Sequence, residues 1–134
     1  MRPSKVRAAL PARPKAAWRQ ALGGQAFREG HGAEWLAAAF LMLKGYQVLG
    51  FRLKTRGVEI DILARQGKTA VVVEVKRRAT IGAALNAVDP RQLERLRAAG
   101  AALLRQRPSL AGLALRIDTI ALAPGRVPRH RRNL

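Results

Sequence analysis

The chain has 134 residues, with 26 lysines and arginines against 8 acids and a formal net charge of +18. This length corresponds to one domain, and an apolar fraction of 49% excludes a disordered basic tail protein. The sequence has no cysteine, which excludes disulfides, thiolate metal sites and cysteine nucleophiles, and makes the cytoplasm the expected compartment.

Residues 1–29 are predicted to form a basic and mostly irregular N-terminal arm, in which a short helix near Trp18 is an option. An organelle transit peptide has a similar composition, but the small number of serines favours a plain basic arm. A nuclease-like domain is expected over residues 30–124. Residues 125–134 are expected to be a loose, basic C-terminal tail.

Local patterns in residues 30–124 predict the order helix, three strands, helix, strand, which is an α/β fold with helices packed against a mixed sheet. The two helices are predicted over residues 33–44, ending at Gly45, and over 89–107, beginning at Asp89-Pro90. The residues between 77 and 88 are predicted to be a loop. The four strands are predicted over residues 47–53, 58–64, 69–76 and 114–122.

Four charged residues stand on the second and third predicted strands. Alternation places Glu59 and Asp61 on one face of their strand and Glu74 and Lys76 on one face of theirs. With Gln66-Gly67 as a two-residue turn, Glu59 lies opposite Glu74, and all four groups converge. The opposite face is wholly apolar and is expected to be the core, formed by Ile60, Ile62, Ala64, Val71, Val73 and Val75.

Facing carboxylates destabilise a sheet, so this cluster favours a hard divalent cation, Mg²⁺ or Mn²⁺, as its ligand. The alternative is an exposed face on which arginines pair with the acids, and Glu59 fits either interpretation. Glu34, in the first predicted helix, is either a further metal ligand or an acid that the helix dipole favours in the first turn. Zinc is not expected, because His31 and His130 lie at opposite ends of the chain.

The sequence resembles the YraN-like family of small predicted endonucleases, which belongs to the PD-(D/E)XK nuclease superfamily. The resemblance extends from about Gly30 to the C-terminus. It rests on the combination of A-E-W-L-A, K-G-Y-Q-V-L, E-I-D-I-L-A-R-Q-G, V-V-V-E-V-K-R-R, D-P-R-Q, L-R-I-D-T-I and P-G-R-V-P-R-H.

The resemblance implies a restriction-endonuclease-like αβββαβ core with Asp61 as the first acid and Glu74-Val75-Lys76 as the (D/E)-x-K motif. Glu34 would match a helix glutamate that is also present in the similar archaeal Holliday junction resolvases. The chain departs from the family pattern at Val58, where a glycine is usual, and at Arg91-Gln92, where a lysine is common. These departures leave the choice of substrate open.

The function expected from these features is metal-dependent hydrolysis of phosphodiester bonds. Asp61 and Glu74 would hold the ion, Glu34 would complete or orient its shell, and Lys76 would position the attacking water and offset negative charge. The rival interpretations are a nucleic-acid-binding module without catalysis, acting on RNA or ribosomes, and an accessory subunit that is active only with a partner.

Nucleic acid is the expected partner because its phosphates reward many basic contacts. The low aromatic content of 4% favours duplex or branched DNA over stacked single strands, and a homodimer is left open. No apolar run reaches the ~20 residues of a membrane span. The arginines expected to contact phosphates are Arg77, Arg78, Arg91, Arg95 and Arg105.

Overall fold

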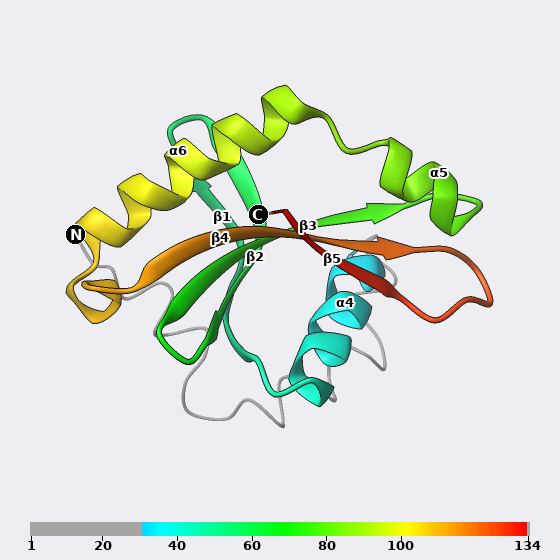
Figure 1. Ribbon diagram of the computed structural model, residues 1–134, viewed down its shortest axis with the longest axis horizontal. Helices are drawn as coiled ribbons and strands as arrows, with labels where there is room; N and C mark the ends of the chain where they lie inside the picture. The colour runs from blue at the N-terminus through cyan, green and yellow to red at the C-terminus, as the bar shows by residue number, and fades with distance from the viewer. Residues whose placement is uncertain (1–30, 134) are drawn as a thin grey trace.

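A five-stranded sheet forms the centre of the structure, a computed structural model that describes residues 31–133 (Figure 1). The strand order is β1-β2-β3-β4-β5, with β3 and β4 parallel and the other neighbours antiparallel. In chain order the elements are α4 Gly32–Leu43, β1 Gln47–Thr55, β2 Val58–Gln66, β3 Thr69–Arg77, α5 Ile81–Asn86, α6 Pro90–Gln106, the 3₁₀ helix η1 Pro108–Leu110, β4 Ala114–Leu122 and β5 Arg129–Asn133.

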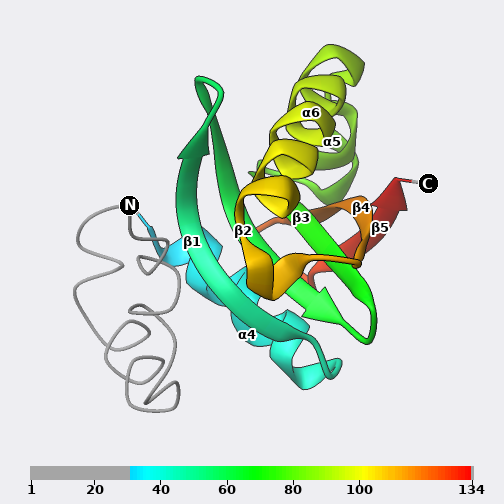
Figure 2. The same ribbon diagram turned by 90° about the vertical axis from the view of Figure 1, so that its left-hand side faces the viewer.

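Helices cover both faces of the sheet, α4 on one face and α5 and α6 on the other (Figures 1 and 2). Under α4, the residues Ala37 and Leu41 pack with Ile62 and Val73 of the sheet. Under α6, Leu96 and Leu103 pack in a second cluster with strand residues of the opposite face. The predicted α/β class with a mixed sheet and flanking helices is confirmed, and the arrangement is consistent with a restriction-endonuclease-like core.

Both long helices begin and end as the sequence predicts. Gly45 follows α4 with φ +91°, a conformation that glycine adopts without a Cβ clash. The Asp89 side chain accepts a hydrogen bond from the Arg91 amide at 2.9 Å and caps α6. A Cβ on Gly100 would lie only 3.0 Å from side-chain atoms of Leu115 and Val72, so glycine allows α6 to approach the sheet closely.

The predicted register of the β2–β3 hairpin is wrong by two residues. Gln66 pairs with Thr69, so the turn residues are Gly67 and Lys68 instead of Gln66 and Gly67. Gly67 has φ +60°, and glycine at the first central position is the preference of a type II′ turn. Glu59 therefore does not lie opposite Glu74, but the parity of the faces is unchanged.

The prediction of one apolar core face is also wrong in part. Ile62, Ala64, Val71 and Val73 are core residues as expected and pack under α4 together with the partly buried Val75, but Ile60 packs in the cluster under α6. The simple alternation of β2 therefore breaks at Asp61, and both faces of the sheet are buried.

Two further elements lie in segments predicted to be irregular. The Thr80 hydroxyl accepts a hydrogen bond from the Ala83 amide at 3.0 Å and caps α5, inside the predicted loop 77–88. Residues 129–133 form β5 and pair with β4, so the expectation of a loose tail is wrong for them. The predicted N-terminal arm, with its optional helix near Trp18, lies outside the described residues. No helix within residues 31–133 is long and apolar enough to cross a membrane.

Candidate active site

The candidate site lies at a fork between β2 and β3. The ladder between these strands ends at the pair Ile62 and Val73, although β2 begins at Val58 and β3 continues to Arg77. Beyond the last pair, β2 stays with β1, and β3 stays with β4. Figure 2 shows the β1–β2 hairpin rising beside α6, away from β3. We call this opening, with Asp61 and Glu74 as the first residue of each arm, the fork.

The Asp61 side chain replaces the missing ladder partner. Its Oδ2 accepts a hydrogen bond from the backbone amide of Val75 at 2.8 Å. Burial raises the pKa of Asp61 to about 6, although the Val75 hydrogen bond acts in the opposite direction. The negative charges of Glu34, Glu74 and Glu59 raise this pKa further. The carboxyl group therefore stands where its charged form lacks a compensating positive charge.

Glu74 is the most buried acid of the fork, with a relative exposure of 6%. Its Oε2 lies 3.3 Å from the Lys76 Nζ. Its Oε1 has no hydrogen-bond partner among residues 31–133. A buried carboxylate oxygen without a partner is costly, because it loses its hydration and gains nothing in return. A cation or a bound water in the fork would satisfy this atom.

Glu34 comes to the fork from the buried side of α4. It lies three, four and seven residues before Ala37, Ala38 and Leu41, which are fully buried, so it shares their helix face. Its Oε1 accepts a hydrogen bond from the Arg52 NH1 at 2.9 Å, and its side chain is 18% exposed. This placement goes beyond a favourable interaction with the helix dipole, because the carboxylate points inward and acts on Asp61.

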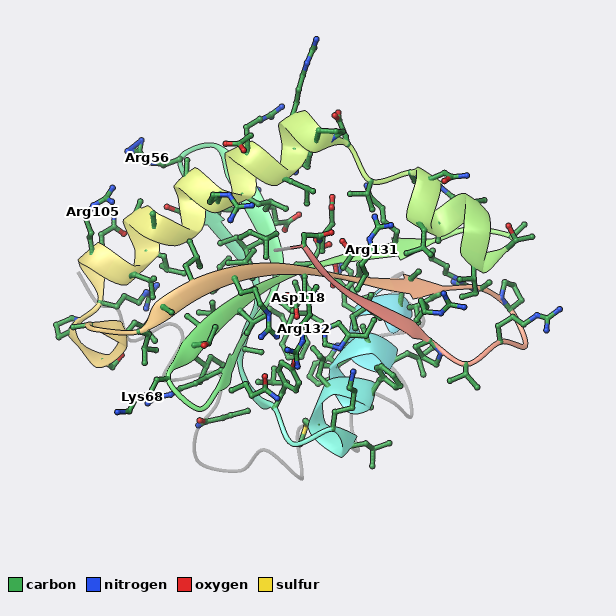
Figure 3. The ribbon with its side chains drawn as sticks, viewed as in Figure 1. Arg56, Lys68, Arg105, Asp118, Arg131 and Arg132 are labelled. Carbon is green, nitrogen blue, oxygen red and sulfur yellow. The ribbon has the colours of Figure 1, made fainter. Side chains whose placement is uncertain are left out.

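The other predicted site residues lie at the exposed surface. Glu59 is exposed and stands opposite Lys54 of β1. The predicted phosphate-contacting residues Arg77, Arg78, Arg91, Arg95 and Arg105 are all exposed, and Figure 3 shows Arg105 at the outer surface of α6. Within residues 31–133, no ion pair joins any of these arginines to a carboxylate.

The donor set suits a site with few protein ligands. No group of three or more histidine, aspartate or glutamate side chains in the described part of the chain is arranged to hold a metal ion by itself. Mg²⁺, however, is often held by one or two carboxylates, with waters and substrate phosphates completing its shell. Asp61 and Glu74, with an orphaned buried oxygen, fit this second kind of site.

The sequence interpretation missed a second buried acid, Asp118 on β4, which is fully buried (Figure 3). Arg116 donates to both carboxylate oxygens at 2.8 Å, and the His130 Nε2 lies 2.7 Å from Oδ2. The His130 Nδ1 lies 2.6 Å from the Lys44 Nζ. Because an ammonium group only donates, Nδ1 accepts from Lys44 and Nε2 donates to Asp118. The sequence signal that could have identified Asp118 is an acid within the largely apolar predicted strand 114–122.

Asp118 has its full set of partners. Burial alone would raise the pKa of Asp118, but the hydrogen bonds from His130 and Arg116 and the charge of the guanidinium hold this pKa below its ordinary value. Arg116 also donates to the Tyr46 hydroxyl at 2.7 Å. The network therefore fastens β5 and the start of β1 to β4, and it leaves no oxygen of Asp118 for a ligand.

Comparison with known proteins shows which family this chain is similar to. The sequence model of the uncharacterised protein family UPF0102 matches residues 33–122. A UPF0102 protein of Caulobacter vibrioides is 54% identical over 112 residues, which cover 84% of this chain and 90% of the relative. A UPF0102 protein of Caulobacter sp. strain K31 is 51% identical and covers 92% and 89%. One from Rhizobium leguminosarum is 48% identical and covers 84% and 92%.

Proposed function

This chain belongs to the UPF0102 family, as its YraN-like motifs predicted, and we propose that it is a metal-dependent nuclease of the PD-(D/E)XK type that hydrolyses phosphodiester bonds at the fork. The observation that carries the proposal is the orphaned Oε1 of buried Glu74 beside Asp61, whose pKa is raised to about 6. Asp61 lacks a compensating positive charge, and Lys76 pairs with only one of the two Glu74 oxygens; Mg²⁺ or Mn²⁺ would supply the missing charge. A purely structural fork would have no reason to keep an unsatisfied buried oxygen.

Each residue of the fork would have its own role in the proposed reaction. Asp61 and Glu74 would hold the ion, and Glu34 would complete or orient its shell from α4. When bound, such an ion polarises the phosphate and lowers the pKa of water. The hydrogen bond from the Val75 amide fixes Asp61 Oδ2 in place, so it also sets the orientation of the other carboxylate oxygen, Oδ1. Above pH 6, Asp61 is mainly a carboxylate and is ready to bind a cation.

Lys76 stands where it can act on the attacking water and on the phosphate. Its ammonium is held 3.3 Å from Glu74 Oε2, and its side chain is 23% exposed. In the proposed reaction the water oxygen attacks phosphorus, the bond to the leaving sugar oxygen breaks, and that oxygen takes up a proton. The Lys76 charge would offset the negative charge that grows on the phosphate during this step.

The surface beside Lys76 supports nucleic acid as the substrate. Ala121 of β4 pairs with Lys76 of β3 on one side and with Arg129 of β5 on the other, so the three residues form one row across the sheet. Arg77, Arg78, Arg126 and Arg129 are exposed near the same strand ends, and none pairs with a carboxylate within residues 31–133. Four unpaired arginines beside a charge-neutralising site would bind a phosphodiester backbone, and DNA remains the favoured substrate.

A non-catalytic nucleic-acid-binding module is the second candidate. Its support is that no three acidic or histidine side chains within residues 31–133 form a complete metal site. Such a protein would bind nucleic acid through the same arginines and leave the backbone intact. An accessory subunit would gain cleavage only when a partner was added.

The test is a cleavage assay on labelled duplex, single-stranded, flap and four-way DNA and on single-stranded RNA, with Mg²⁺, Mn²⁺ or EDTA. We expect cleavage of at least one structured DNA with metal and none with EDTA. Glu74→Gln and Asp61→Asn should each lower the rate by more than about 100-fold, because they remove ligands of the ion. Glu94→Gln, a change of an exposed acid on α6, is the matched control. Binding without cleavage would favour the second candidate.

A further inference from the structure

Arg52 has an unusual backbone conformation in the middle of β1. Its φ is +47°, and among residues 31–133 only Arg56 shares a positive φ without being glycine. Such a conformation is strained for a residue that carries a side chain. Arg56 lies in the turn between β1 and β2, where a positive φ is common. Arg52 lies inside the paired part of β1, so a turn does not explain its conformation.

The register places Arg52 beside the fork. Phe51 pairs with Ile62 and Leu53 pairs with Ile60, so Arg52 and Asp61 are the residues between these two pairs. Its guanidinium NH1 donates to Glu34 Oε1 at 2.9 Å. Arg52 is therefore the cation on the β1 side of the fork acids, whereas Lys76 is the cation on the β3 side.

The Arg52 guanidinium has donors to spare. A guanidinium carries five N–H groups, and Glu34 accepts one hydrogen bond from it in the described part of the chain. The Arg52 side chain is 35% exposed, so part of it faces solvent. The neighbouring Phe51 ring packs against Trp35 of α4, with ring centroids 4.3 Å apart, which holds β1 to α4 next to Arg52.

We propose that Arg52 binds the phosphate of the substrate at the fork, an inference that rests on the proposed nuclease function. In the metal-free protein Arg52 neutralises Glu34. When Glu34 turns to a cation, the guanidinium loses this partner and can donate two parallel hydrogen bonds to non-bridging phosphate oxygens. Arginine suits this role because its planar guanidinium presents parallel N–H donors that match a phosphate, whereas a lysine ammonium does not. The left-handed backbone keeps the guanidinium on the site side of β1.

The test uses Arg52→Asn, because asparagine tolerates a positive φ, and Arg56→Asn as the matched control with the same charge change and backbone conformation. Arg52→Lys keeps the charge beside Glu34 but loses the planar guanidinium group. The first readout is fluorescence anisotropy with a labelled, cleavage-resistant phosphorothioate duplex, in EDTA and in Mn²⁺. The second is the rate of cleavage of whichever DNA the wild-type protein cuts. Thermal melts check that each variant is folded.

We expect Arg52→Asn and Arg56→Asn to bind the duplex alike in EDTA, where Glu34 still holds Arg52. In Mn²⁺, Arg52→Asn should bind about 10-fold more weakly than Arg56→Asn, because a charge-assisted contact to phosphate is lost. Its KM should rise to a similar extent, and its kcat should fall about 100-fold because the same contact offsets the charge that grows on the phosphate; Arg52→Lys should restore little of either. Full rescue by lysine, or equal behaviour of the two asparagine variants in Mn²⁺, would overturn the proposal for Arg52 alone. A wild-type protein that neither cuts nor gains affinity with Mn²⁺ would overturn the proposed function as well.

Discussion

Asp118 and Glu74 are buried carboxylates and Asp61 is a partly buried one, all on neighbouring strands, and their surroundings differ. Asp118 is fully enclosed and receives hydrogen bonds from Arg116 and His130, which hold its pKa below the ordinary value despite burial. Asp61 is partly buried among like charges, and its pKa is raised to about 6. Glu74 keeps one buried oxygen without a partner in the described part of the chain.

This difference separates a structural acid from a ligand-binding acid. A buried charge with all its partners fixes elements to one another and has no capacity left for a ligand. A buried charge without its full set of partners costs stability until something supplies the missing charge. The two regions should therefore respond in opposite directions to neutralisation, to pH and to metal.

The largest effect is expected for Asp118→Asn. The change leaves the Arg116 and His130 side chains, 12% and 3% exposed, without their carboxylate partner. Removing one member of such a buried pair costs about 3–5 kcal/mol of unfolding free energy. Urea unfolding at pH 7.5 measures this cost, with Glu94→Gln as a control that should not change. A loss below about 1 kcal/mol would show that the network does not fasten β5.

Asp61→Asn is expected to stabilise the metal-free protein. The folded state keeps a proton on Asp61 up to about pH 6, whereas the unfolded chain releases it near 3.8, so stability falls as pH rises between these values. Above pH 7 the penalty approaches roughly 3 kcal/mol, at 1.36 kcal/mol per pKa unit. Asparagine removes the charge and can still accept from the Val75 amide. Unfolding in EDTA at pH 4 and pH 8 should show a gain at pH 8 alone, and a loss at pH 8 would refute this account.

Asp118 should have the opposite pH dependence. Its pKa is lowered in the folded protein, so its stabilising effect is present above the ordinary value of 3.8 and is lost as the pH falls through the folded value. The acid side of the stability curve should therefore depend on Asp118, and the decline between pH 4 and pH 6 should depend on Asp61.

Mn²⁺ is expected to stabilise the wild-type protein by about 2.7 kcal/mol at a concentration 100 times its dissociation constant. The gain arises because the fork binds the ion and the unfolded chain does not. It should shrink below pH 6, where Asp61 takes up a proton, and it should vanish in Asp61→Asn. Thermal melts at pH 5.5 and pH 8 with Mn²⁺ or EDTA measure it. An unchanged melting temperature at millimolar Mn²⁺ and pH 8 would contradict the metal site.

The smallest effect is expected for Glu59→Gln. Glu59 is exposed and lies opposite Lys54, and its charge raises the pKa of Asp61 less than the charges of Glu34 and Glu74 do. The unfolding free energy should change by less than about 0.5 kcal/mol, as for most surface substitutions. The Mn²⁺-induced melting shift should remain. A variant that loses this shift would show that Glu59 is a metal ligand after all.

Local sequence signals account for much of the fold. The Asp89-Pro90 start of α6 and the glycine after α4 are local features, and both are present in the structure. The strand β5 was missed because its arginine-rich sequence has no strand pattern of its own. It is held by tertiary contacts with β4, from His130 to Asp118 and from Asn133 to Thr119. The hairpin register was missed because Gly67 could occupy either central position of a two-residue turn.

The candidate site divides in the same way. Alternation was enough to place Glu74 and Lys76 on one face of β3, where they form an ion pair, because strand parity is a local property. The end of the β2–β3 ladder and the positive φ of Arg52 are consequences of tertiary packing, and no short motif encodes them. The Asp118 network joins residues that are 86 positions apart at Lys44 and His130, so it was also beyond local patterns.

The most direct test of the fork as a metal site is a titration of the protein with Mn²⁺, in which electron paramagnetic resonance reports the free ion. The wild-type protein and the Glu94→Gln control should each show saturable binding at pH 8, and Glu74→Gln should lose it. Saturable binding that survives in Glu74→Gln, or a wild-type protein that binds no Mn²⁺, would contradict the assignment of the orphaned Glu74 oxygen to a metal ion.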